Sequence, residues 1–246
     1  MIPIVVLLLA PSLVILPLSV SQRQVLAWPP RGFTLDWYFS LFASGRWWDS
    51  AIHSVEVAAA STVIAVLLGV PAGVTLGLRS FRFKDVVLAI AVVPLVIPTV
   101  VLAIGMYKVY VWLGLYDLLG LAAAHAMIGV PLVVVTTMSA ARQLDPVLIL
   151  ASRSLGAGPI RTFFLVILPG VRSGVISGAF FAFASSWDEV IIANFLSSPT
   201  YRTIPVQMWA QINQHVDPTV AALASVLFIL SMAMMAGLAM ASRRAR

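Results

Sequence analysis

Residues 54–78 read SVEVAAASTVIAVLLGVPAGVTLGL, an apolar run in which Glu56 is the single charged residue. A helix needs about 20 consecutive apolar residues to cross a bilayer, so this run is long enough to span one. A membrane barrel strand would instead alternate apolar and polar residues over a shorter length. The run therefore predicts a transmembrane helix and an all-α integral membrane protein.

The composition of the whole chain excludes several functional classes. Of the 246 residues, 61% are hydrophobic and 10% are charged, and the mean hydropathy is +1.03. Soluble domains carry about 25% charged residues, so a soluble enzyme is excluded. The net charge is +6, but the basic residues are dispersed, which argues against a nucleic-acid partner. Cysteine is absent, and no metal site is expected.

Six apolar runs predict six transmembrane helices in one transmembrane domain that covers residues 1–246. The runs lie at about 2–20, 54–78, 86–107, 119–140, 171–193 and 218–241. The first run resembles a signal peptide in position. No Lys or Arg precedes it and no small-residue cleavage site follows it, so a retained span is the preferred interpretation.

Lysine and arginine residues set the expected orientation. With a cytoplasmic N-terminus, ten of the fifteen basic residues fall in inner segments, which the positive-inside rule favours. We therefore expect both termini in the cytoplasm. The first outer segment, about 21–53, is rich in tryptophan and is expected to anchor at the membrane interface.

Small residues and prolines predict how the spans pack. Gly69, Gly73 and Gly77 are four residues apart on the second span, and Gly170, Gly174 and Gly178 repeat this spacing on the fifth. Residues four apart share a helix face, so both series are expected to be close helix contacts. Pro94 and Pro98 are expected to bend the third span. His125 in the fourth span is either a packing residue or a proton relay, and packing is preferred because no acidic partner is evident in the sequence.

The longest inner connection, about 141–169, predicts a helical elbow. Asp145 suits a helix N-cap with Pro146 at the first position, Gly156 suits a left-handed helix end, and Pro159 suits the start of a second helix. Leu148, Leu155 and Phe163 are expected to form an apolar face with Arg153 and Arg161 at its edge. Such a surface suits docking into a partner's groove, although a plain connecting loop is the simpler alternative.

The same elbow resembles the inner-loop motif of permease subunits of ABC importers. That motif reads Glu-Ala-Ala, three residues, Gly, nine residues, then Ile-x-Leu-Pro. Here Leu150, Ala151 and Ser152 occupy the first three positions, Gly156 follows, and VILP stands at 166–169. Leu150 replaces the glutamate of the motif. The resemblance implies that the elbow is a coupling helix that contacts an ATPase, through Leu150, Ala151, Ser152, Arg153, Leu155, Gly156, Ala157 and Pro159.

The resemblance extends to permeases of the spermidine/putrescine type, in particular the second of their two homologous subunits. It is carried by FTLDWY at 33–38, VPLVIP at 93–98, LDP at 144–146 and SWDEVI at 186–191. It implies a type I importer permease fold in a bacterial inner membrane, with a homologous permease, two copies of a cytoplasmic ABC ATPase and an extracytoplasmic binding protein as partners. No nucleotide-binding P-loop occurs in this chain, so ATP and Mg²⁺ are expected on the ATPase, with no cofactor in this non-catalytic subunit.

Trp187, Asp188 and Glu189 form the candidate substrate path at the outer end of the fifth span. The carboxylates would attract a cation, and the indole ring would offer a cation–π contact. Alternatively, both carboxylates reach headgroup water or cap neighbouring segments.

The predicted function is a permease subunit that imports a small organic solute, with a polyamine or related amine as the first choice. An amino-acid derivative or an opine is the alternative cargo. A secondary transporter or channel driven by an ion gradient is the alternative class, but it would leave the inner elbow without a role.

Overall fold

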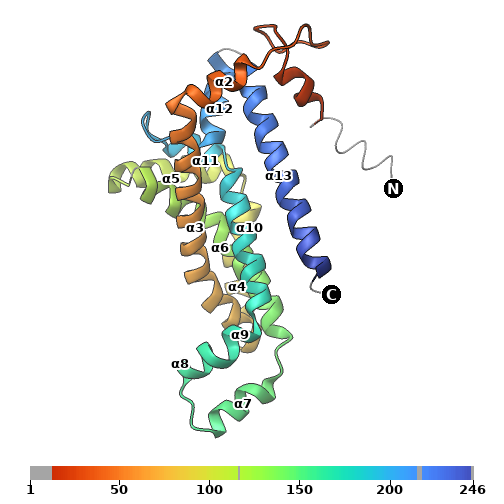
Figure 1. Cartoon of the computed structure of the whole chain (residues 1–246). Helices are drawn as coiled ribbons and strands as arrows, with labels where there is room; N and C mark the ends of the chain where they lie inside the picture. Colours follow the sequence, from red (N-terminus) through yellow and green to blue (C-terminus); the bar gives the residue numbers. More distant parts are fainter. Residues whose placement is uncertain (1–12, 116, 215–217, 245–246) are drawn as a thin grey trace. The chain divides into compact units, whose positions relative to one another are not determined.

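The structure is a computed structural model that describes residues 13–115, 117–214 and 218–244. The described residues are mostly helical, as the apolar runs predict, and their only β-structure is a single bridge between Ser198 and Tyr201. The helices are α2 (Asp36–Ala43), α3 (Gly45–Leu78), α4 (Lys84–Val96), α5 (Thr99–Leu113), α6 (Asp117–Arg142), α7 (Pro146–Ser154), α8 (Pro159–Thr162), the π-helix η1 (Phe163–Ile167), α9 (Leu168–Gly170), α10 (Arg172–Trp187), α11 (Ile191–Leu196), α12 (Ile204–Gln214) and α13 (Pro218–Arg244) (Figure 1).

The chain divides into two compact units, residues 1–49 with 207–246 and residues 50–206. In the first unit α2 packs against α13. The segment before α2 is fastened by two side chains, since the Tyr38 hydroxyl lies 2.7 Å from the Ser19 hydroxyl and the Trp37 indole donates to the Ser21 carbonyl over 2.8 Å. Several rings of the aromatic-rich outer segment are exposed, including Trp28, Phe39 and Trp48.

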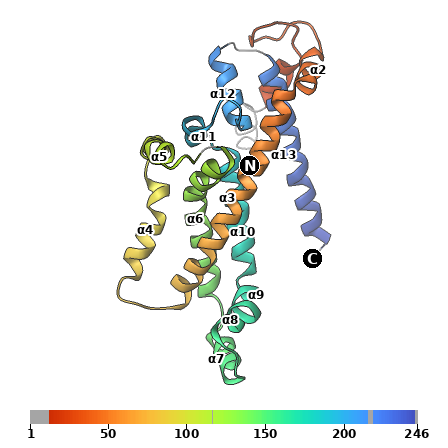
Figure 2. The same ribbon diagram turned by 90° about the vertical axis from the view of Figure 1, so that its left-hand side faces the viewer.

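In the second unit α3, α6 and α10 run side by side (Figures 1 and 2). Five of the six glycines in the two series explain this packing, because they meet α6. Gly170 does not, because it lies in α9 before the bend and faces the Leu144 side chain. A Cβ atom on Gly73 would lie 2.7 Å from the Val134 carbonyl oxygen, and one on Gly174 would lie 2.6 Å from the Thr136 carbonyl oxygen. Only glycine leaves room for backbones this close, so the predicted glycine contacts are confirmed on two faces of one helix.

Two of the predicted spans are single continuous helices, and two consist of helices joined at a bend. By length and hydropathy, α3 and α6 are each able to cross a membrane. The third predicted span bends by 98° between α4 and α5, at Ile97 and Pro98, which confirms the bend expected there. A bend of 74° also separates the segment Pro159–Gly170 from α10.

The first, fifth and sixth apolar runs differ in how well their predicted boundaries match the helices. The fifth run was expected to continue to residue 193, but α10 ends at Trp187 and α11 begins only at Ile191, so this expectation was wrong. The sixth run matches α13. In the first run, residues 1–12 lie outside the described residues, and residues 13–19 are helical.

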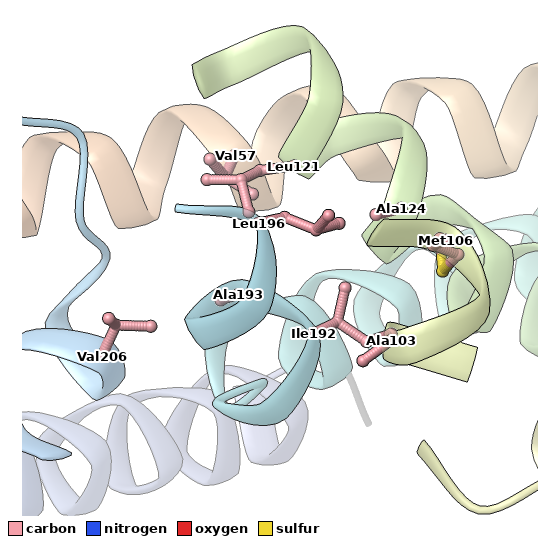
Figure 3. Packing of buried hydrophobic residues seen from close by; sticks show 9 residues of the cluster. All are labelled: Val57, Ala103, Met106, Leu121, Ala124, Ile192, Ala193, Leu196 and Val206. Atoms are coloured by element: carbon pink, nitrogen blue, oxygen red, sulfur yellow. The ribbon is translucent and has the colours of Figure 1, made fainter. Parts of the chain in front are cut away.

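At the end of the second unit away from α7, the helices α5, α6 and α11 enclose an apolar cluster. Its buried members include Ala103 and Met106 of α5, Leu121 of α6, and Ile192 and Leu196 of α11. Figure 3 shows these side chains converging from helices that are far apart in the sequence. The cluster holds α5 across the end of the bundle, because α5 would otherwise expose this apolar face after the turn at Pro98.

Candidate functional site

The elbow, about 141–169, has the local structure that its residues predict. The Asp145 carboxylate accepts a hydrogen bond of 2.9 Å from the Val147 amide, so it caps α7, and Pro146 occupies the first turn. Gly156 has a φ of +81°, in the left-handed region where a residue with a Cβ is strained. Pro159 begins α8. Four local signals thus determine a helix, a tight turn and a second helix.

A hydroxyl pair joins the two arms of the elbow. Ser152 Oγ lies 3.1 Å from Thr162 Oγ1, and Thr162 is buried. The prediction that Phe163 belongs to the exposed apolar face is wrong. Phe163 instead packs against the buried cluster that includes Val74 and Val171. The π-helical turn that begins at Phe163 belongs to this inward-packed arm.

The outer surface of the elbow is apolar and exposed. The Leu155 side chain is 88% exposed, and Leu148, Leu150 and Ile160 are also exposed. Among the remaining predicted coupling residues, Ala151, Arg153 and Pro159 are exposed, while Ser152 and Ala157 are partly covered. Covering the four apolar side chains would remove them from water, which is favourable, and this is the property of a docking surface.

The elbow also borders a cavity of about 530 Å³ at the end of α3. Its lining includes Arg79, the residue after α3, together with Leu150 and Arg153 from α7. Two of the predicted inner segments, one after the second span and one after the fourth, therefore meet at one end of this unit. That is the arrangement the positive-inside argument expects for a single side of the membrane.

The acidic pair at the end of the fifth span lies in a helix break, and its two carboxylates face different surroundings. Glu189 is 9% exposed. Its carboxylate accepts hydrogen bonds from the amides of Ile191 and Ile192 at 3.0 Å and of Ala193 at 2.9 Å. Glu189 thereby caps α11, which favours the capping alternative for this residue. Asp188 is exposed.

His125 lies beside this break. Its Nδ1 is 2.8 Å from the Ser186 hydroxyl, and its Nε2 is 3.8 Å from Glu189 Oε2. The ring is 2% exposed, and Nε2 has no hydrogen-bond partner in the described chain. The histidine thus has an acidic neighbour, contrary to the impression from the sequence, because the fold brings α6 against the end of α10.

Asp188 opens onto a cavity of about 400 Å³. Thr99 from the start of α5 and Ser185 from α10 line the same cavity, so the two helix breaks, at Pro98 and at residues 188–190, meet there. Trp187 is half-buried and its ring stacks on Phe183 with 6.2 Å between ring centres. The arrangement places one free carboxylate and two hydroxyl-bearing residues at the junction of two discontinuous helices, a kind of place where transporters bind solutes.

A second polar cluster, which the sequence did not reveal, fastens the loop after α11 to α3. The Tyr201 hydroxyl donates to Glu56 Oε2 over 2.8 Å, and its ring stacks on His53 at 3.8 Å. The Ser198 hydroxyl donates to Asp117 over 2.7 Å. Burial and the Glu56 hydrogen bond raise the pKa of Tyr201, so this phenol keeps its proton at neutral pH. The residues come from distant segments, which is why no sequence pattern indicated them.

The sequence of this chain is similar to a known family of transport proteins and to individual permeases. Residues 69–246 match the family of binding-protein-dependent transport system inner membrane components. The spermidine/putrescine transport system permease protein PotC of Escherichia coli (strain K12) is 31% identical over 87% of this chain and 81% of its own. The putrescine transport system permease protein PotI of the same organism is 30% identical over 89% and 81%.

The fold has a counterpart among solved structures. A chain of a bacterial ABC transporter involved in the import of the acidic polysaccharide alginate superposes with a TM-score of 0.71, at 14% identity, over 98% of this chain and 91% of that one. The likeness concerns the fold alone. The family is shown by the match over residues 69–246, and the chain therefore belongs to the binding-protein-dependent transport system inner membrane components.

Proposed function

We propose that this chain is the permease subunit through which a polyamine or a related organic amine crosses the bacterial inner membrane. The observation that carries the proposal is the exposed carboxylate of Asp188 in the cavity where two helix breaks meet. A carboxylate there attracts an ammonium group, and the neighbouring hydroxyls replace part of its hydration shell. The similarity to two permeases named for spermidine and putrescine supports the same cargo.

The complete importer consists, in this proposal, of this chain, a homologous permease, two ABC ATPase subunits and an extracytoplasmic binding protein. ATP and Mg²⁺ bind to the ATPase subunits, and this chain carries no catalytic residue. The elbow transmits the closure of the ATPases to the bent segment before α10. Support comes from the exposed apolar surface around Leu155 and from the direct connection of the elbow to that segment.

The cargo is tested by ATPase measurements on the reconstituted importer with its binding protein. We expect spermidine or putrescine to stimulate hydrolysis, and an amino-acid derivative or an opine to have no effect. Asp188→Asn should lower amine uptake about tenfold, which corresponds to about 1.4 kcal/mol of lost stabilisation. Asp49→Asn, a change at another exposed carboxylate, is the control and should leave uptake unchanged. Stimulation by the alternative solutes alone would refute the amine cargo.

The coupling role is tested by Leu155→Asp. Because this side chain is 88% exposed, the substitution should leave the fold of the subunit intact. It should place a charge in the apolar contact with the ATPase, so uptake and solute-stimulated hydrolysis should both fall by about tenfold or more. Leu155→Met keeps the apolar contact and should retain activity. Normal uptake by the aspartate variant would show that the elbow does not couple.

A further inference from the structure

Helix α10 presents two neighbouring faces of opposite chemical character. Ile176 and Phe180, which are 67% and 57% exposed, form an apolar face. Ser177 and Asp188, the residue that follows the C-terminal end of α10, point in another direction and are also exposed, and Ser173 lies at the border between the two faces. Ser177 and Asp188 are eleven residues apart, and at about 100° per residue their directions differ by only about 20°. The polar face therefore follows the length of the helix.

Helix α6 contributes a matching face. Ser139 of α6 and Gln143, the residue after α6, line a cavity of about 760 Å³ together with Ser173 and Ser177 of α10. Ile128 of α6 lines the outer cavity of about 400 Å³ that holds Asp188. Ile128 and Ser139 are again eleven residues apart, so one face of α6 reaches both cavities. The two cavities thus lie along one edge of the α6–α10 pair, about 16 Å apart along the helix axis, and we call this edge the α6–α10 furrow.

Phe181 lies on this polar face between the two cavities. It is one turn beyond Ser177 and two turns before Asp188, and its ring is 50% exposed. Together with the exposed Ala184 it makes the middle of this stripe apolar, while its edge-on partner Phe180 points toward the Ile176 face. Phe181 lines neither cavity, and its position in the helix places its ring at a level between them.

We propose that the solute travels along the α6–α10 furrow and that Phe181 is the constriction between its outer, carboxylate-bearing cavity and its inner, hydroxyl-lined cavity. The inference rests on the proposed permease function. The hydroxyl and amide oxygens of the inner cavity serve as hydrogen-bond acceptors for an ammonium group that has left Asp188. The apolar face with Ile176 and Phe180 faces lipid or protein and takes no part in passage.

The route is tested by thiol labelling, which this chain permits because it contains no cysteine. The complete importer, with cysteine-free partner subunits, carries Ser177→Cys or, as the control, Ile176→Cys. A small, cationic, membrane-impermeant methanethiosulfonate reagent is added on the elbow side of vesicles in the absence of ATP. We expect modification at position 177 and not at position 176. Protection of position 177, or equal modification of both, would overturn the route.

The constriction is tested with the same reagent added on the opposite side. Phe181→Ala combined with Ser177→Cys should raise the rate of modification about tenfold over Ser177→Cys alone. Phe180→Ala combined with Ser177→Cys is the matched control and should not change the rate. Equal rates in the Phe181 and Phe180 variants would overturn the role of Phe181. The readout is a labelling rate and requires no polyamine, so an error in the proposed cargo would show only in the ATPase measurements.

Discussion

Asp188 and Glu189 are adjacent in the sequence and yet have different surroundings. Both residues line the cavity of about 400 Å³, but the Glu189 carboxylate is occupied by three backbone amides of α11, whereas Asp188 is exposed. The three amides belong to the first turn of a helix, where no intrahelical acceptor is available, and two of them come from fully buried residues. Glu189 therefore caps the helix that follows the break in the fifth span, and in the proposed function Asp188 is the carboxylate that a passing cation meets.

This division gives a prediction for the glutamate. Glu189→Ala removes the acceptor of buried amides and should lower the free energy of unfolding by about 1–3 kcal/mol. Glu189→Gln keeps one acceptor oxygen and should cost less, with uptake near normal. The measurement is the thermal unfolding of the purified complex, followed by uptake in vesicles. An uptake defect in Glu189→Gln as large as that of Asp188→Asn would place both carboxylates on the path.

Whether a contact between two residues can be predicted from the sequence depends on how far apart they lie in the chain. Asp145, Pro146 and Gly156 act on their immediate neighbours, so the sequence alone predicts their roles in the elbow, and the structure confirms each. His125 and Glu189 meet only because α6 packs against α10. A lone sequence contains no signal for that meeting, and the histidine therefore looked unpaired.

At the scale of elements, the packing of α6 follows from small residues on its two neighbours. The four-residue glycine spacing predicts close helix contacts but does not say which helix fills them. The structure identifies α6 as the partner of every glycine in the two series except Gly170. The third span shows the same limit, because Pro98 predicts a bend, whereas its 98° depends on the cluster that α5 forms with α6 and α11.

Gly73→Ala tests this packing. The added Cβ would meet the backbone oxygen of Val134 at 2.7 Å and the Thr137 Cβ at 2.9 Å, so α3 and α6 would have to separate. We expect a loss of about 1–3 kcal/mol in the free energy of unfolding, seen as a lower melting temperature. Gly105→Ala is the matched control, since nothing lies within 4 Å of its added Cβ. Its melting temperature should be unchanged or slightly higher, because alanine is the better helix former. Equal effects at the two positions would refute the packing argument.

At the scale of the whole molecule, the orientation in the membrane is still a prediction from the distribution of Lys and Arg. Arg79 and Arg153 border one cavity, so the segments after the second and fourth spans share one end of their unit. That agreement does not say which side of the membrane the end faces. Ten of fifteen basic residues in the predicted inner segments favour the cytoplasm.

Single cysteine substitutions decide this orientation without interference, since the chain has no native cysteine. In intact cells, an impermeant thiol reagent should label Ser44→Cys, in the predicted outer segment. Ser154→Cys at the exposed end of α7, and Ser242→Cys near the C-terminus, should be labelled only after the membrane is opened. The elbow is able to reach a cytoplasmic ATPase only in this orientation, so labelling of Ser154→Cys in intact cells would refute the topology and the coupling role together. Labelling of Ser242→Cys alone would instead indicate an odd number of crossings between the elbow and the C-terminus, while leaving the elbow in the cytoplasm.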